Sequence, residues 1–306
     1  MTSDRTQEDN LKKRAAARWS LISNAVLVLL KLTVGIISGS VGVLAEVVNS
    51  SADLVGAGVV YFAVRVSDEP PDHSHAYGHG KIENLSGIAT ATLILAGGGF
   101  AATKACWQLF HGAPLTSLGP AMGVMAFSAA VNVIVSRRLL KVGHETESPA
   151  LISDGFHLQT DILTSVGVFF GLLLVKLTHH QAWDAVVALA VSVMILRMGF
   201  HLAGDAIRTL ADESLSLAEE QKLEDVLRAN PAVLGFHKLR TRRSGSHRHA
   251  DVHVQIDDRL SFVAAHRITE DLEQELRDAL PNLHPIIHME PYEDERAHQI
   301  AEQGKG

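Results

Sequence analysis

The sequence predicts an α-helical membrane domain of six transmembrane helices followed by a soluble α+β domain. Long apolar runs fill residues 19–202 of the 306-residue chain, whereas residues 1–18 and the part after residue 204 are rich in charged residues and histidine. The apolar runs are long enough to cross a hydrocarbon core of roughly 30 Å, which needs about 20 helical residues. The C-terminal part instead shows short strand patterns and amphipathic helical patterns.

Six stretches meet the length needed for a membrane span. They lie at residues 19–38, 41–64, 82–106, 115–135, 151–177 and 183–201. The first stretch is too long for a signal peptide, lacks a small-residue cleavage site and is followed by further spans, so we expect a retained helix. Residues 1–18 would then form a cytoplasmic segment, and residues 19–204 the transmembrane domain.

Lysine and arginine residues at the ends of the spans predict the orientation, because positively charged loops stay in the cytoplasm. The residues in question are Lys12, Lys13, Arg14, Arg18, Arg65, Lys81, Arg137, Arg138, Lys141 and Arg208. The loops 39–40, 111–114 and 178–182 contain neither residue type. Both termini are therefore expected on the cytoplasmic side.

Composition argues against redox chemistry and against nucleic-acid binding. The single cysteine, Cys106, cannot form an intrachain disulfide or a thiolate metal site. The formal net charge of −7 argues against nucleic-acid binding, and a solvated hairpin or strand end explains the short basic run at 240–243 better. We therefore expect membrane lipid, and no nucleic acid, among the partners.

Polar and ionisable side chains interrupt two of the predicted spans in the same order. The second span contains Asn49 and Asp53 four residues apart, and the fifth contains His157 and Asp161 at the same spacing. Positions i and i+4 of a helix lie about one turn apart on one face, so each pair is able to share one ion. If the two helices pack together, the four side chains form one cage inside the membrane, where ionisable groups mark ion or proton pathways.

The ligand types indicate a transition metal. An imidazole with carboxylates suits zinc, iron, cobalt, nickel or manganese, whereas calcium and magnesium prefer shells of oxygen. Glu46 and Asp154 precede the two pairs by three residues and lie nearer the helix ends, where we expect them to support the ligands or line the entrance. The alternative interpretation is that all these groups only form hydrogen bonds between helices.

Protons compete with a metal for the same ligands, since binding needs a neutral imidazole and ionised carboxylates. Histidine is the side chain that ordinarily titrates near neutral pH, so His157 is expected to exchange protons between compartments of different pH. The residues therefore predict a metal/proton antiporter that works by alternating access, and not a channel.

Together these motifs resemble the cation diffusion facilitator family. The resemblance depends on Asn49-x-x-x-Asp53, on His157-x-x-x-Asp161, on the histidine-containing loop 71–81 and on the histidine-rich C-terminal pattern. It covers almost the whole chain and is greatest to bacterial zinc and iron exporters of the proton-antiporter type. It implies a homodimer in the bacterial inner membrane, with divalent metal ions (Zn, Fe, Co, Ni or Mn) at several sites per protomer.

The loop between the second and third spans is expected to hold a further metal site. By the same resemblance its ligands are Asp72, His75 and His79, whereas His73 does not match the family pattern. The loop begins with proline and ends with glycine, as an exposed metal site would require. The alternative is that these histidines are simply solvated.

Residues 205–292 are predicted to form a small α+β domain with the order helix, strand, strand, helix, strand. The elements are expected at residues 217–230, 233–242, 250–257, 262–280 and 285–290. This order is similar to the ferredoxin-like αββαβ cytoplasmic domain of the family, which dimerises and binds metal between protomers. Residues 293–306 are expected to be a polar, disordered tail.

The resemblance also implies the metal ligands of this domain. They are His237, His253, His266, His288 and Glu290. Side chains alternate along a strand, so those within each predicted strand are able to share one face. Glu290 stands where the family often has aspartate. His247 and His249 have no counterpart and are expected to be solvated near the hairpin.

Asn49 departs from the family pattern, which usually has aspartate or histidine at this position. A neutral amide removes a charge or a nitrogen donor, so we expect weaker zinc binding or a preference for an ion that accepts six ligands. Glu46 would partly replace the missing charge. The same departure leaves open a metal sensor or assembly scaffold that keeps the fold without the flux.

Two further interpretations concern single features. A membrane metalloenzyme is the main alternative in another class, but neither His-Glu-x-x-His nor Gly-x-Ser-x-Gly occurs in the chain. Lys81, at the start of the third span, is expected to pair with an acid such as Asp212, to contact the partner protomer, or to anchor the helix at the membrane surface.

Overall fold

The protein divides into two compact units, Met1–Ile207 and Arg208–Gly306. The structure, a computed structural model, describes residues 2–38, 41–111, 119–178, 180 and 182–293. The side chains of some residues within these helices, among them Glu46 and Asn49, lie outside the description.

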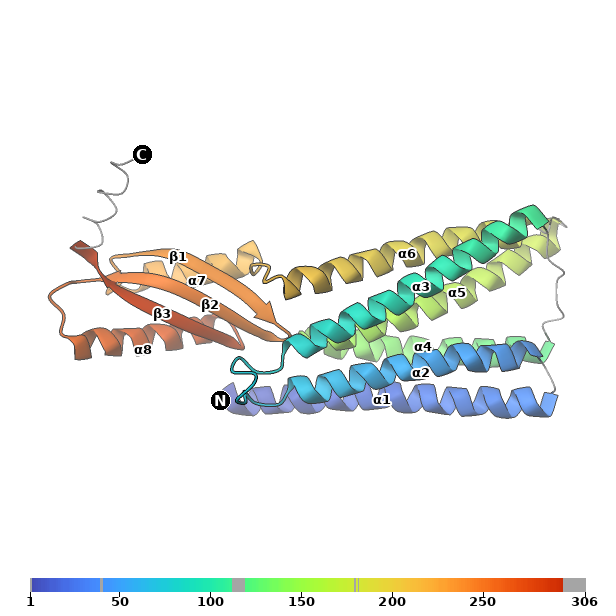
Figure 1. Cartoon of the computed structure of the whole chain (residues 1–306), viewed down its shortest axis with the longest axis horizontal. Helices are drawn as coiled ribbons and strands as arrows, with labels where there is room; N and C mark the ends of the chain where they lie inside the picture. The colour runs from blue at the N-terminus through green and yellow to red at the C-terminus, as the bar shows by residue number, and fades with distance from the viewer. Residues whose placement is uncertain (1, 39–40, 112–118, 179, 181, 294–306) are drawn as a thin grey trace. The chain divides into compact units, whose positions relative to one another are not determined.

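Long helices form the first unit (Figure 1). Within the described residues they are α1 (Thr2–Ser38), α2 (Val41–Ser67), α3 (Lys81–His111), α4 (Gly119–Glu145), α5 (Pro149–Thr178) and α6 (Ala182–Leu210). Helix α2 packs against α1, α3 and α5, and α4 packs against α1 and α5. This arrangement places the polar faces of α2 and α5 next to each other inside the bundle.

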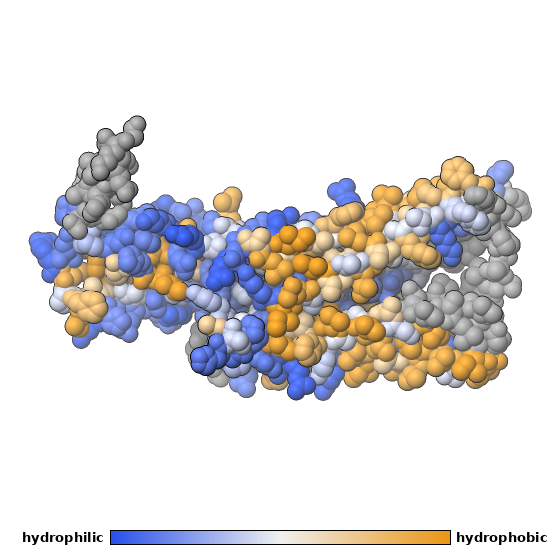
Figure 2. Space-filling view, viewed as in Figure 1, coloured by the Kyte–Doolittle hydropathy of each residue, from blue (hydrophilic) through white to orange (hydrophobic). Residues whose placement is uncertain are grey.

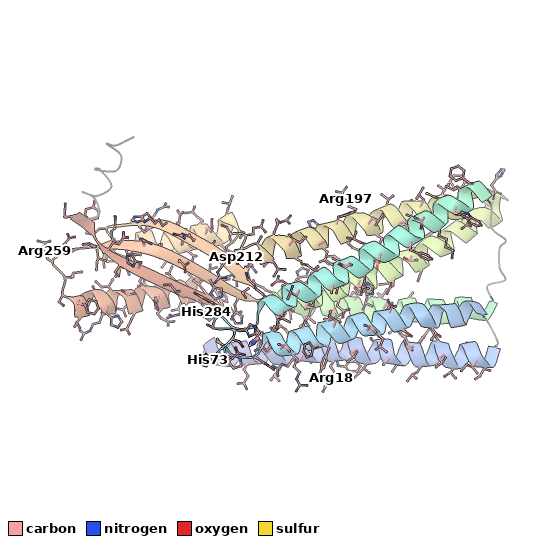
Figure 3. The ribbon with its side chains drawn as sticks, viewed as in Figure 1. Arg18, His73, Arg197, Asp212, Arg259 and His284 are labelled. Atoms are coloured by element: carbon pink, nitrogen blue, oxygen red, sulfur yellow. The ribbon has the colours of Figure 1, made fainter. Side chains whose placement is uncertain are left out.

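The outer surface of the helical unit is apolar. Large hydrophobic side chains such as Ile36, Phe62 and Phe200 are more than half exposed, and Figure 2 shows apolar side chains over the helices. In the described residues, three segments are long and apolar enough to cross a membrane: Gln7–Val34, Lys81–Phe110 and Ala185–Leu210. Arg18 and Arg197 are exposed and point away from α1 and α6 (Figure 3).

Small residues allow α3 and α6 to approach each other closely. A Cβ atom at Gly98 would lie 3.0 Å from Cγ2 of Ile195, and one at Gly199 would lie 2.9 Å from Cδ2 of Leu95. Helices inside a membrane associate mainly through such close packing, because lipid provides no hydrophobic driving force between them. The two glycines therefore define the contact between these helices.

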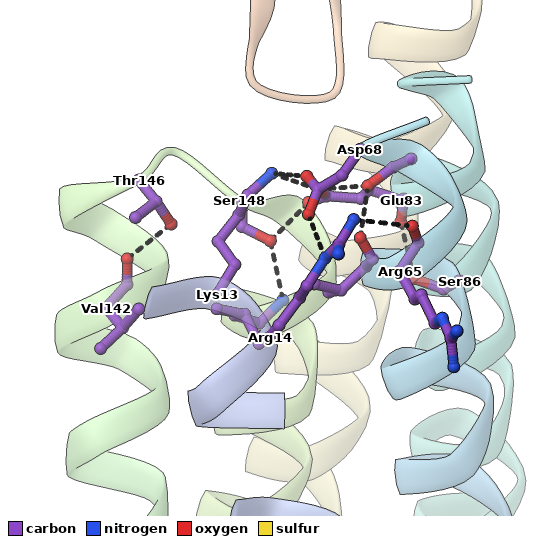
Figure 4. Close-up of polar contacts among 12 residues, drawn as sticks. Lys13, Arg14, Arg65, Asp68, Glu83, Ser86, Val142, Thr146 and Ser148 are labelled. Carbon is purple, nitrogen blue, oxygen red and sulfur yellow. Dashed lines mark hydrogen bonds and ion pairs between the residues drawn. The ribbon is translucent and has the colours of Figure 1, made fainter. Parts of the chain in front are cut away.

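A buried ionic network joins the helices next to the α2–α3 loop (Figure 4). Nζ of Lys13 lies 2.7 Å from Oδ1 of Asp68 and 3.2 Å from Oε1 of Glu83. Glu83 also accepts hydrogen bonds from Ser67, at 2.9 Å, and from Ser148. A buried carboxylate is stable only when it is paired and hydrogen-bonded, so this network fixes the packing of α1, α2, α3 and α5 at this end.

The second unit is a three-stranded sheet with helices on one face. Its elements are α7 (Leu217–Ala229), β1 (Gly235–Ser244), β2 (His247–Ile256), α8 (Phe262–Ala279) and β3 (Leu283–Pro291), in the expected order. The strand order is β1-β2-β3, with β1 and β2 antiparallel and β2 and β3 parallel. Ser216 and Ser261 occupy the N-cap positions of the two helices.

Alternation along the strands separates an apolar face from a histidine-bearing face. Val252 and Val254 of β2 are buried in one core with Leu223 of α7 and with Leu272 and Leu276 of α8. Residues at the odd positions of β2, which include three histidines, point to the other face because side chains alternate. The helices therefore leave the histidine-bearing face uncovered within the described part of this unit.

Strand β2 begins earlier than the sequence predicts. The expected strand starts at residue 250, whereas β2 starts at His247 and pairs with β1 from Ser244 onward. The turn between them consists of Gly245 and Ser246, and Gly245 has a φ of 59°, a conformation that suits glycine. His247 and His249 therefore lie beside the turn of the β1–β2 hairpin as expected, but both belong to the strand and are only partly exposed, so they are less solvated than predicted.

Candidate metal centres

The first candidate centre lies between α2 and α5. Asp53 of α2 and His157 of α5 are in contact, with Nε2 of His157 3.2 Å from Oδ1 of Asp53. Asp161, one turn after His157, adds a second carboxylate, and ligand atoms of the three side chains all lie within 4.8 Å of one another. Asp53 and His157 are only 14% and 12% exposed. Among the described residues, Nδ1 of His157 is buried without a hydrogen-bond partner.

Asp154 lies one turn before His157 but outside this group of ligand atoms. Its carboxylate is 2% exposed and accepts a 2.6 Å hydrogen bond from Oγ of Ser20 in α1. Asp154 therefore links α1 to the ligand-bearing helix. The side chains of Glu46 and Asn49 lie outside the described residues, so their predicted roles stay predictions.

Sequence analysis missed a buried lysine near this centre. Lys31 of α1 is 6% exposed, and its Nζ donates a 2.7 Å hydrogen bond to Oγ of Ser50 in α2. Ser50 lies one helical turn before Asp53. The signal was available in the sequence, because Lys31 is a charged residue inside a predicted span and such residues usually face the bundle interior.

The second candidate centre lies in the loop between α2 and α3, at Asp72, His75 and His79. Asp72 lies 3.3 Å from Nδ1 of His75 through one oxygen and 3.3 Å from Nε2 of His79 through the other. The two imidazole rings are 4.4 Å apart between centroids. The loop folds back at Gly78, which has a φ of 81° and donates its N–H to the carbonyl of His75. The structure thus brings all three predicted loop ligands together, with His73 exposed beside them.

Hydrogen bonds hold Asp72 of the loop centre in its ionised form. The backbone N–H of His75, followed by the hydroxyl of Ser74, lowers the pKa of Asp72 to about 2. Because the pKa is lowered, these bonds stabilise the loop above the ordinary pKa of aspartate and are lost only as the pH falls toward about 2. Asp72 is therefore a carboxylate throughout the range in which histidine exchanges protons.

Asp72→Asn is expected to weaken metal binding by the loop about 10-fold, by a similar factor at every pH between 5 and 8, because the lost carboxylate does not titrate there. Metal affinity of the purified protein, measured by titration calorimetry at several pH values, checks this. His73→Asn provides the control, with unchanged affinity expected. A loss that vanishes at pH 5 would show that Asp72 itself takes up a proton in this range.

The third candidate centre lies on the uncovered face of the sheet. Glu290 of β3 bridges two histidines: one oxygen lies 2.5 Å from Nδ1 of His253 and the other 3.2 Å from Nε2 of His237. His288, paired with His253 in the β2–β3 register, lies at the edge of the group, with Nε2 3.7 Å from Glu290. A bulge at Lys238, with a φ of 51°, shifts the register of β1 just after His237.

His266 is separate from this third centre. It lies on α8, is 62% exposed and has Nε2 3.5 Å from Oε1 of Glu270. Helix α8 packs through Leu272 and Leu276 on the apolar face of the sheet, opposite the histidine-bearing face. His266 is therefore not part of the group within one chain, and its role as a metal ligand stays a prediction. The sequence did not reveal this because α8 and the strands meet only in the tertiary fold.

Glu290→Ala is expected to lower the metal affinity of the third centre about 10- to 100-fold, since the bridging carboxylate is its only negative ligand. Zinc titrations of the full-length protein in the presence of a competing chelator check this. Glu224→Ala, on α7 and outside this group of ligands, should leave the titration unchanged. Equal affinities for the native chain and Glu290→Ala would contradict the assignment.

The same face carries a second set of histidines near the β1–β2 turn. Nε2 of His284 lies 3.3 Å from Nδ1 of His247, and the ring of His249 stacks on that of His284. Burial, assisted by the nearby charge of Arg242, lowers the pKa of His249 to about 4. Burial also lowers the pKa of His284. The imidazole of His249 is therefore neutral at physiological pH.

The predicted pair of Lys81 and Asp212 stays a prediction. Lys81 is the first residue of α3 in the first unit, and Asp212 follows α6 in the second. Within its own unit, Asp212 lies 3.4 Å from Nη1 of Arg242.

The donor sets of the three centres fit divalent transition metals. Each combines one or two imidazoles with at least one carboxylate, a set that suits zinc and its neighbours. Among the described residues, Nδ1 of His79 is buried without a hydrogen-bond partner, as is Nδ1 of His157. Each group is already assembled, so binding would need little rearrangement.

Comparison with known proteins identifies the family. Residues 17–211 match the model of the cation efflux transmembrane domain, and residues 215–292 match that of the cation efflux protein cytoplasmic domain. The cation-efflux pump FieF of Salmonella schwarzengrund is 31% identical over 281 residues, which are 92% of this chain and 93% of the pump. The same pump from Salmonella newport matches over the same shares of both chains, also with 31% identity.

Two solved structures of similar proteins each match about a quarter of the chain. The metal-bound C-terminal domain of the CzcD transporter from Thermotoga maritima is 26% identical and covers 24% of this chain and 88% of that domain, with a TM-score of 0.24. The Zn form of CzrB is 31% identical and covers 26% of this chain and 92% of that one, again with a TM-score of 0.24. From the two family models and the full-length relatives, the chain belongs to the cation diffusion facilitator family of cation-efflux proteins, with a transmembrane domain followed by the family's cytoplasmic domain.

Proposed function

We propose that this protein exports a divalent transition-metal ion from the cytoplasm in exchange for protons. The observation that supports this most directly is the group of Asp53, His157 and Asp161 in the interior of the helical bundle. Its two carboxylates balance the charge of a divalent cation, which lowers the cost of holding the ion in a low-dielectric environment. Binding is reversible in principle because protons compete for all three side chains.

Asn49 is the remaining proposed ligand, one turn before Asp53 in α2. An amide oxygen would complete the shell without adding charge. We therefore expect the ion to be Zn, Fe, Co, Ni or Mn. We also expect zinc to bind less tightly than it would if residue 49 were an aspartate or a histidine. Glu46, about one turn before Asn49 in α2, and Asp154 would support the ligands or line the entrance.

The proposed mechanism is alternating access across the bacterial inner membrane. The ion enters from the cytoplasm, is held between α2 and α5, and leaves outward as protons arrive at His157 and the carboxylates. We propose that α1 to α6 all cross the membrane, with both termini in the cytoplasm. In this arrangement the transmembrane domain comprises residues 19–204 and the cytoplasmic domain residues 205–292.

The cytoplasmic domain is proposed to act as a homodimer that binds metal between protomers. The uncovered sheet face with His237, His253, His288 and Glu290 would then meet the partner subunit. His266, which lies apart from this group within one chain, would contribute only across such an interface. The loop centre at Asp72, His75 and His79 would bind a further ion on each protomer.

Transport into reconstituted vesicles tests the proposed function. The native protein should accumulate one or more of Zn, Fe, Co, Ni and Mn in vesicles with an acidic lumen, and the lumenal pH should rise as protons leave in exchange. Collapse of the pH gradient with an ionophore should stop accumulation. Metal movement that ignores the pH gradient would rule out antiport.

A sensor or assembly scaffold is the second candidate, favoured by the neutral amide at Asn49. A scaffold would bind metal in calorimetry but move none of the five ions into vesicles. Asn49→Asp further separates a transporter from a scaffold. In a transporter the added carboxylate should strengthen zinc binding and change the rate of zinc transport. A chain that transports no metal, either as native protein or as Asn49→Asp, would be the scaffold.

A further inference from the structure

His247, His249 and His284 lie together at one end of the uncovered sheet face. His249 and His284 are directly paired in the parallel β2–β3 register, and His247 precedes His249 by two residues on the same face. Figure 3 labels His284, near the start of β3. The next histidine pair in this register, His253 and His288, comes four residues later. At roughly 3.3 Å per residue, the two groups are about 13 Å apart.

The rings of His247 and His284 are placed as in a metal site, whereas His249 stacks on His284 and its nitrogens are not within 4.8 Å of both partners. His284 lies between the other two, with ring centroids 5.3 Å from His247 and 5.3 Å from His249. Nε2 of His284 lies 3.3 Å from Nδ1 of His247. Two nitrogens bound to one tetrahedral zinc at 2.0–2.1 Å are also separated by about 3.3 Å. The position of these two nitrogens therefore suits a shared ion as well as it suits a hydrogen bond.

We propose that His247, His249 and His284 form a fourth metal site, distinct from the centre at Glu290. Three imidazoles favour a borderline divalent ion such as Zn²⁺, Co²⁺ or Ni²⁺ over calcium or magnesium. His284 and His247 already present two nitrogens, and a change in side-chain torsion brings in His249. Water fills the remaining position.

The surrounding charges predict when this site fills. None of its ligands carries a negative charge, and Arg242 lies opposite His249 in the β1–β2 register. Asp251, two residues after His249 on the same face, is exposed and offers the nearest balancing charge on β2. The site should therefore bind more weakly than the centre at Glu290, and fill only when cytoplasmic metal is high. The occupancy of such a site changes at metal concentrations that already saturate the tighter centres, so it responds to an excess of metal.

Counting bound metal in the full-length protein tests this proposal. Native protein, His284→Asn and His249→Asn are equilibrated with Co²⁺ at a concentration that saturates the native chain, and bound cobalt per chain is measured by mass spectrometry of the metal. Both variants should bind one ion fewer than the native chain, and that last ion should be the weakest. His144→Asn, an exposed histidine at the end of α4, should bind the native number.

A failure of the proposed fourth metal site can be distinguished from a failure of the proposed transport function. Both variants should still move metal into vesicles, because the site lies outside the membrane domain. Equal cobalt numbers in the native chain and the variants would leave the three histidines as a hydrogen-bonded stack and overturn the proposal. Loss of an ion in His284→Asn but not in His249→Asn would overturn the three-histidine ligand set. Unchanged circular dichroism confirms that either variant is folded.

Discussion

Asp161→Ala is expected to abolish metal uptake into vesicles, with a loss of at least about 100-fold. Asp161 supplies one of the two carboxylates in the group with Asp53 and His157. Without it, a divalent ion inside the bundle keeps an unbalanced positive charge, which is costly in a low-dielectric environment. Even residues that only support a metal ligand change affinity about 10- to 100-fold when they are replaced, so a ligand should matter more.

The matched control for this prediction is Asp205→Ala. Asp205 lies on α6, outside the three candidate centres, with an oxygen 3.5 Å from Nε2 of His201. Asp205→Ala changes the net charge by the same amount as Asp161→Ala. An effect of net charge alone on uptake would therefore appear in both variants. Full uptake by Asp161→Ala, with native amounts of folded protein in the vesicles, would remove the proposed transport site.

Lys13→Met should produce the largest loss of stability among single changes in the helical unit. Lys13 is 3% exposed and pairs with Asp68 at 2.7 Å and with Glu83 at 3.2 Å. Removing one partner of a buried ion pair costs about 3–5 kcal/mol, because the remaining charge is left buried without compensation. Glu83, 1% exposed, would keep only its serine donors. Unfolding by denaturing detergent, followed by helical circular dichroism, measures the loss.

Two variants distinguish the network from a general effect of removing lysine. Lys12→Met, next in sequence but 46% exposed and paired with Glu8, should unfold at the native midpoint. The double variant Lys13→Met with Glu83→Gln should recover part of the lost stability, because it removes the uncompensated carboxylate. Equal midpoints for Lys13→Met and Lys12→Met would mean that the network does not stabilise the bundle.

The amino-acid sequence alone predicts the ligand types and much of the architecture. Apolar length predicted long helices, and the described residues contain a long helix in each of the six predicted spans. The spacing of Asp53, His157 and Asp161 predicted one site, because helical periodicity fixes which side chains share a face. Strand alternation and proline positions predicted the order of the second unit. The family resemblance is confirmed by matches to both domains.

The tertiary structure decided what depends on contacts between distant segments. Lys13 and Glu83 are seventy residues apart, and no local pattern marks them as partners. Within one chain His266 lies on α8, apart from the group of His237, His253 and Glu290, which the residue type alone did not reveal. The sequence placed His247 and His249 in the hairpin region, and only the parallel register of β2 and β3 paired His249 with His284. Local periodicity fixes the face on which a side chain lies, whereas the packing of elements fixes what that face meets.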